Sequence, residues 1–114
     1  MQVDVKVDFN VPKISDHIDK GIASANKELI PILTNYARSN HRYNDRTGNL
    51  TQSTVTRDIS KGLQLYASAN YGQYVHQGHG TWVSDPWLEN TIKENEQLIR
   101  DTYSKHIADE LRRM

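Results

Sequence analysis

Histidines and aromatic residues are concentrated in one stretch, "YGQYVHQGHGTWVSDPW", which covers residues 71–87. His76 and His79 are three residues apart and, with Asp85 or Glu89, could supply the imidazole and carboxylate ligands of a metal site. Glycines flank His79 on both sides, however, which favours a loop position, and the spacing differs from the His-Glu-x-x-His pattern of zinc proteases. The sequence therefore favours polar loop histidines over a metal pair, and no cofactor is predicted.

The aromatic side chains of this stretch could instead stack on nucleic-acid bases. Such a platform needs a basic groove that follows the phosphates, but residues 66–92 contain no Lys or Arg. In the whole chain, 14 basic side chains balance 14 acidic ones. Packing in the core or at a protein interface is therefore the favoured role of these aromatic residues.

Other catalytic patterns are missing from the sequence. It contains no Gly-x-Ser-x-Gly turn and no glycine-rich run that ends in Gly-Lys-Ser or Gly-Lys-Thr. The chain has no cysteine, which excludes a thiol nucleophile and a thiolate metal site. These observations predict a protein that is not an enzyme.

Length and hydropathy predict one small domain with little apolar area of its own, which oligomerisation could supplement. The 114 residues fit a single domain, residues 1–114, and only 36% of them are hydrophobic. A mean hydropathy of −0.77 is low for a domain that must bury its own core. Because no apolar run approaches the roughly 20 residues of a membrane span, and the start shows no signal-peptide pattern, we expect a soluble, non-secreted protein without membrane contacts.

The first half of the chain shows two clear periodicities. Apolar residues alternate with charged ones from Val3 to Phe9, which predicts a strand with one solvated face. From Ile14 to about Ser39 apolar residues recur every three or four positions, which predicts an amphipathic helix. Pro31 lies within this helix and predicts a kink or a break.

The second half predicts a hairpin and two helices. Residues 50–59 and 63–69 are rich in β-branched and aromatic residues and flank the turn "SKG". A short helix is expected over residues 71–77, and a long one from Pro86 to Leu111, capped by Ser84 or Asp85. The predicted fold class is α+β, with a small, mainly antiparallel β-sheet packed against a long N-terminal and a long C-terminal α-helix.

The stretch "DRTGNL" is a second local signature. It is typical of a turn in which Gly48 takes a positive φ, Thr47 bonds back to the chain and Leu50 anchors the loop to the core. Alternatively, Arg46 could bind a carboxylate or carbonyl of a neighbouring subunit. The turn is the favoured interpretation, because loop arginines are commonly solvated.

Three elements in this order resemble a known family, the tail-completion or head-tail joining proteins of long-tailed bacteriophages. The first is Arg-Thr-Gly-x-Leu-x-x-Ser, formed here by Arg46, Thr47, Gly48, Leu50 and Ser53. The second is Tyr-x-x-Tyr-Val-x-x-Gly-x-Gly, formed by Tyr71, Tyr74, Val75, Gly78 and Gly80. The third is Pro-aromatic-Leu, formed by Pro86, Trp87 and Leu88. Within this pattern His76 replaces a commonly acidic residue, and Trp87 replaces the usual phenylalanine.

The resemblance implies a structural virion protein located in the phage neck and assembled in the host cytoplasm. Such proteins form a homo-oligomeric ring, commonly a hexamer, between the head completion or stopper protein and the tail terminator or tail tube. DNA would pass through the lumen without specific binding. Among the motif residues and their neighbours, Arg46, Tyr74, Trp82 and Trp87 are the strongest candidates for setting the structure or forming an interface.

Two alternatives stay open at this point. The chain could be a tail terminator or another neck protein of the same particle. From a different class, it could be a small metal-dependent hydrolase that uses His76 and His79.

Overall fold

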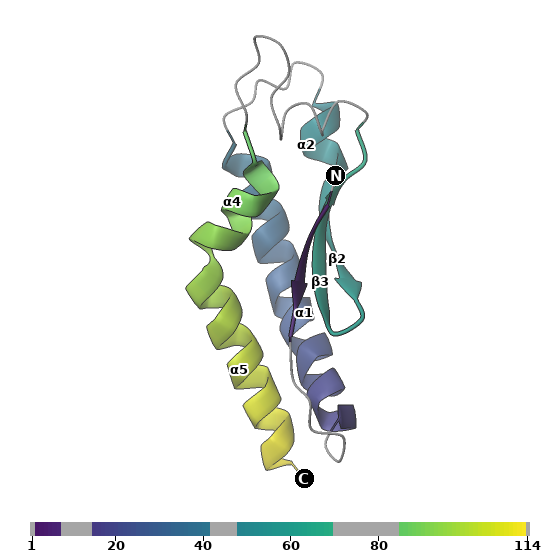
Figure 1. The fold of residues 1–114 in the computed structure, drawn as a ribbon, viewed down its shortest axis with the longest axis vertical. Helices are drawn as coiled ribbons and strands as arrows, with labels where there is room; N and C mark the ends of the chain where they lie inside the picture. The colour runs from purple at the N-terminus through teal and green to yellow at the C-terminus, as the bar shows by residue number, and fades with distance from the viewer. Residues whose placement is uncertain (1, 8–14, 42–47, 70–84, 114) are drawn as a thin grey trace.

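The computed structural model describes residues 2–7, 15–41, 48–69 and 85–113, and Figure 1 shows its fold. Two long helices and a small sheet run along one axis. The elements are, in chain order, β1 (Gln2–Lys6), α1 (Ser15–Ser39), α2 (Asn49–Ser53), β2 (Thr54–Ile59), β3 (Gly62–Ala67), α4 (Trp87–Glu94) and α5 (Glu96–Arg112). This arrangement confirms the predicted α+β class.

The described strands form an antiparallel sheet in the order β1-β3-β2. Val3, Val5 and Val7 pack partly buried against the core, whereas Gln2, Asp4 and Lys6 are exposed, as their alternation predicts. Phe9, the last residue of that pattern, lies outside the described residues. β1 lies so close to β3 at Gly62 that a Cβ on this glycine would be 1.8 Å from the carbonyl oxygen of Val5. The sheet therefore requires a residue without a side chain at this position.

Helix α1 ends at Ser39 as predicted and is continuous from Ser15 to Ser39, so of the kink or break expected at Pro31 the break is absent. The ring of Pro31 lies on the exposed side of the helix, where water can bond the carbonyl that loses its N–H partner. On the opposite side, Leu29 and Leu33 are completely buried. Their packing offsets the loss of one hydrogen bond.

The predicted hairpin is present as β2 and β3, but its first part was assigned wrongly. Residues 49–53 form the short helix α2 instead of extending the strand. Thr54 explains the boundary, because its backbone turns to an extended conformation while its hydroxyl donates to the carbonyl of Leu50 at 2.8 Å. Residues with β-branched side chains can thus end a helix as well as begin a strand.

The predicted C-terminal helix is in fact two helices, α4 and α5, separated at Asn95. Asn95 has φ −112° and ψ 16°, outside the helical range, and its side chain donates to the carbonyl of Thr91 at 2.8 Å. Asparagine competes in this way with helical backbone bonds, which explains the interruption. Because apolar residues keep their spacing on both sides of the interruption, periodicity alone could not reveal it.

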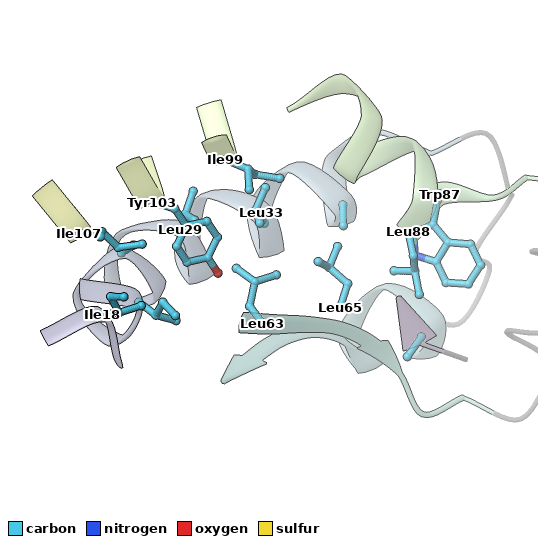
Figure 2. Packing of buried hydrophobic residues seen from close by; sticks show 14 of the residues in the cluster. Ile18, Leu29, Leu33, Leu63, Leu65, Trp87, Leu88, Ile99, Tyr103 and Ile107 are labelled. Atoms are coloured by element: carbon cyan, nitrogen blue, oxygen red, sulfur yellow. The ribbon is translucent and has the colours of Figure 1, made fainter. Parts of the chain in front are cut away.

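The core lies between the sheet and the helices (Figure 2). Leu63 and Leu65 of β3 point toward Leu29 and Leu33 of α1, and Ile99, Tyr103 and Ile107 of α5 approach from the other side. The principal-axis extents are 55 × 21 × 20 Å, and the radius of gyration is 15.9 Å. A compact domain of this length would have a radius of about 13 Å. The subunit is therefore elongated, with a core that is long and thin.

A buried polar group, Asn26 of α1, connects three parts of this core. Its Nδ2 donates to the carboxylate of Asp58 and to the carbonyl of Gly62, both at 2.8 Å. Its Oδ1 accepts a hydrogen bond of 2.5 Å from the hydroxyl of Tyr103 in α5. Asn26 is only 2% exposed, so all three bonds replace bonds to water. The residue fixes α1, the hairpin and α5 relative to one another.

The Tyr103 phenol should make stability depend on pH in the alkaline range. Burial, and secondly the negative charge of Asp58, raise the pKa of Tyr103 above its usual value of about 10. The folded state thus holds this proton more tightly than the unfolded state, and its contribution is complete below about pH 10 and declines at higher pH. Urea unfolding of the wild type from about pH 8 to 11 should show a steeper alkaline loss than that of Tyr103→Phe. Equal slopes would contradict this assignment.

Candidate functional site: the end of the subunit where α2 and α4 lie

The structure describes part of the candidate set. Gly48, Leu50, Pro86, Trp87 and Leu88 lie within the described residues. The remaining candidates, and the two histidines of the proposed metal pair, lie outside them; these residues are Arg46, Thr47, Tyr71, Tyr74, Gly78, Gly80, Trp82, His76 and His79. The predicted helix over residues 71–77 also lies outside the described residues.

The first motif element begins α2. Gly48 adopts φ 77°, the left-handed conformation that glycine takes without strain, and its carbonyl accepts from the Gln52 amide at 2.9 Å. Leu50 follows and is completely buried. Ser53 donates to the Leu50 carbonyl at 2.9 Å and accepts from the Ala69 amide at 3.2 Å. This serine therefore holds the chain that leaves β3 against the end of α2.

Arg38, near the end of α1, also holds this region in place. Its Nε donates to the carbonyl of Thr54 at 2.9 Å, and one terminal nitrogen donates to the carbonyl of Gln52 at 3.2 Å. The sequence analysis did not single out this arginine. The available signal was a basic residue in the last turn of a predicted helix, which is common and gives no indication of a partner.

The third motif element begins α4. Pro86 is the residue before the helix, with φ −77° and ψ 63°, and Trp87 is the first helical residue. The residue at the N-cap position is thus Pro86 rather than the predicted Asp85, and Ser84 lies outside the described residues. The backbone forms a tight turn here, in which the Trp87 amide donates to the Asp85 carbonyl at 2.8 Å. Trp87 and Leu88 are both completely buried.

These two elements lie at the same end of the subunit. Figure 1 shows α2 and the start of α4 close to the C-terminal end of α1. Leu50, Trp87 and Leu88 belong to the same buried cluster as Ala37 of α1 and Ala67 of β3. Segments 42–47 and 70–84 are flanked by His41, Gly48, Ala69 and Asp85. These four residues thus all lie at this packed end.

A polar seam runs along the neighbouring surface between α1 and the C-terminal helices. The hydroxyl of Tyr36 donates to the carboxylate of Glu94 in α4, and this hydrogen bond raises the pKa of Tyr36. Farther along, Nε2 of His106 in α5 lies 3.2 Å from a carboxylate oxygen of Glu28. Both pairs join residues distant in sequence, so they order the helices without suggesting a reaction.

The described part of the chain offers little for catalysis. It contains no group of three or more His, Asp or Glu side chains that could hold a metal ion. An open, polar depression of about 400 Å³ lies at the junction of α4 and α5, lined by Lys93, Glu94, Glu96, Gln97 and Arg100. Its flexible charged side chains lack the apolar walls of a typical ligand pocket. None of the described helices combines the length and apolar character needed to cross a membrane.

Comparisons with protein-family models, with curated proteins and with solved structures found no match to this chain.

Proposed function

We propose that this chain is a structural protein of the neck of a long-tailed bacteriophage, which forms a ring and joins the DNA-filled head to the tail. The proposal starts from the resemblance of three ordered elements in residues 46–88 to head-tail joining proteins. A hexameric ring would bind the head completion or stopper protein on one face and the tail terminator or tail tube on the other. Another position in the same neck is the nearest alternative.

The observation that carries the proposal is the common location of the first and third elements. Leu50 and Trp87 are far apart in sequence, yet both are completely buried at the same end of the subunit. Ala69 and Asp85, the described residues on either side of segment 70–84, both pack at this end. This placement supports a role in which the core fixes the ends of a motif-bearing segment so that the segment can contact other proteins.

Shape and charge also agree with a ring component. An elongated subunit of 55 × 21 × 20 Å offers long sides for contacts between neighbours. Heterologous contacts of this kind close a ring when the rotation between neighbours divides a full turn. A chain with equal numbers of acidic and basic residues would also avoid the tight phosphate binding that would hold DNA in a passage.

Native mass spectrometry and negative-stain imaging test this proposal. The purified chain, alone and mixed with head-completion and tail-terminator proteins of candidate phages, should give a ring that binds at least one partner on each side. DNA binding should be weak and not steeply dependent on salt. A strict monomer that joins neither partner would contradict the proposal, and stoichiometric zinc, manganese or iron would support a metal-dependent hydrolase instead.

A further inference from the structure

The two edges of the sheet differ in the way their backbone groups are used. At the β2 edge, the amide of Thr56 donates to the hydroxyl of Thr34 at 3.1 Å, and the carbonyl of Thr54 accepts from Arg38 at 2.9 Å. Side chains of α1 therefore occupy two of the groups with which a further strand would pair. Natural proteins commonly protect an edge strand in this way.

The β1 edge has no such protection among the described residues. The amide of Val7 donates to the carbonyl of Lys61 at 2.7 Å, and these two residues lie directly opposite each other. In an antiparallel ladder, hydrogen-bonded and non-bonded pairs alternate. The other bonded pairs between β1 and β3 are therefore Val5–Leu63 and Val3–Leu65. The amides and carbonyls of Gln2, Asp4 and Lys6 then point away from β3. No hydrogen bond from a described residue reaches these backbone groups. Figure 1 shows β1 at the margin of the sheet opposite β2.

We infer that β1 pairs antiparallel with β1 of a second copy of this chain, with Val5 on the two-fold axis. In β1, only the even-numbered residues direct their amides and carbonyls away from β3. Two copies of β1 can therefore pair only in registers that place even-numbered residues opposite even-numbered residues. One places Asp4 opposite Asp4 of the second copy, which is repulsive. The next places Asp4 opposite Lys6 twice, Val5 opposite Val5 and Val3 opposite Val7. Among the described residues, this is the register that pairs opposite charges twice, and these two Asp4–Lys6 pairs select it.

The side chains in this register match in chemistry on both faces of the sheet. Asp4 and Lys6 are exposed on the outer face, and one oxygen of Asp4 already accepts from Gln64 at 2.9 Å, which leaves its second oxygen for a lysine of the other copy. Val3, Val5 and Val7 are half-buried on the inner face. Pairing would cover their remaining apolar surface. Two outward groups of β2 are already bonded to side chains of α1, so a head-to-tail contact from β1 to β2 is disfavoured and the symmetric contact is favoured.

Cysteine cross-linking tests the register, since the chain has no cysteine of its own. Val5 of each copy would form a non-bonded pair with Cα atoms about 4.5 Å apart, within disulfide range. Val5→Cys should therefore give a disulfide-linked dimer under mild oxidation. Val3→Cys is the matched control, because its two copies would lie about 13 Å apart along the strands and should not cross-link. Equal cross-linking of both variants, or none of Val5→Cys, would overturn the inference.

A charge exchange tests the pairing itself by sedimentation at high micromolar concentration. Lys6→Asp replaces two opposite-charge pairs by two like-charge pairs and should weaken the dimer at least about tenfold. Adding Asp4→Lys restores opposite charges in the same register and should recover most of the affinity. Far-UV circular dichroism and thermal unfolding confirm that both variants fold. A wild-type monomer, or a Lys6→Asp variant that dimerises unchanged, would overturn the pairing.

This inference is independent of the proposed function. A ring with only cyclic symmetry brings different surfaces of neighbours together, so it would not place Val5 against Val5. The cross-link therefore reports on the β1 contact whether or not the chain joins head and tail proteins.

Discussion

Replacing Trp87 by alanine should lower the free energy of unfolding by about 3–5 kcal/mol, the cost typical of removing a fully buried large aromatic side chain. Trp87 is completely buried, as are its neighbour Leu88 and Leu50 of α2. The substitution would therefore leave a cavity in the buried core cluster, which water could enter only at the cost of exposing apolar walls. Urea unfolding followed by far-UV circular dichroism measures the change without depending on tryptophan fluorescence.

Two further variants make the Trp87 measurement specific. Trp87→Phe keeps most of the buried apolar volume and should cost clearly less than the alanine variant. Lys93→Ala changes an exposed residue of the same helix, α4, and should stay within about 0.5 kcal/mol of the wild type. If Trp87→Ala cost less than about 1 kcal/mol, the residue would not be the enclosed core element described above.

The second large effect is expected at Asn26. Asn26→Ala should lower the free energy of unfolding by about 2–4 kcal/mol, because it leaves the Tyr103 hydroxyl and the Gly62 carbonyl without their buried partner. The bond to Asp58 is lost as well. Removing one member of a buried hydrogen-bond network usually costs more than the bond itself contributes, since the remaining groups stay desolvated.

Asn35→Ala is the matched control for this measurement. Asn35 is exposed on the same helix, so the exchange makes the same change in helix propensity without touching the buried network. Its free energy of unfolding should equal or slightly exceed that of the wild type. A double-mutant cycle with Tyr103→Phe should show that the two substitutions are not additive, and additivity would mean that Asn26 and Tyr103 do not act on each other.

Periodicity predicted the elements with long, regular patterns. The alternation from Val3 to Val7 and the apolar stripe from Ile18 to Leu33 each match one buried face of a strand or helix. Such patterns are reliable because burial of one face requires them. The α+β class and the hairpin followed from the same reasoning.

The misassigned positions are those where local hydrogen bonds decide the structure. Thr54 ends α2, and Asn95 separates α4 from α5, through side-chain bonds to carbonyls one turn earlier. At Pro31, by contrast, packing of the inner face of α1 kept the helix continuous, although proline has no backbone N–H to donate. Asn26 was not singled out either, since an asparagine inside an amphipathic pattern gives no sign of its distant partners. Local side-chain bonds thus decided the structure at Thr54 and Asn95, whereas tertiary contacts decided it at Pro31 and Asn26.

For the candidate site, the sequence predicted which residues are buried better than it predicted which groups they contact. A leucine after the turn and a tryptophan at a helix start were recognisable, and both are buried at the same end of the subunit. Arg38 shows what was missed, because its carbonyl partners belong to residues that only the fold brings near. Assigning partners on other proteins to the motif residues needs contacts that one chain does not contain.

The position of β1 also affects the order in which the chain can fold during synthesis. β1 leaves the ribosome first, but its partner β3 ends at Ala67, and α1 must wait longer for α5, which ends at Arg112. Until then the valines of β1 and the apolar face of α1 have no final partner. The nascent chain therefore carries an unpaired strand until β3 has emerged, a condition under which pairing between neighbouring nascent chains on one messenger RNA competes with completion of the fold.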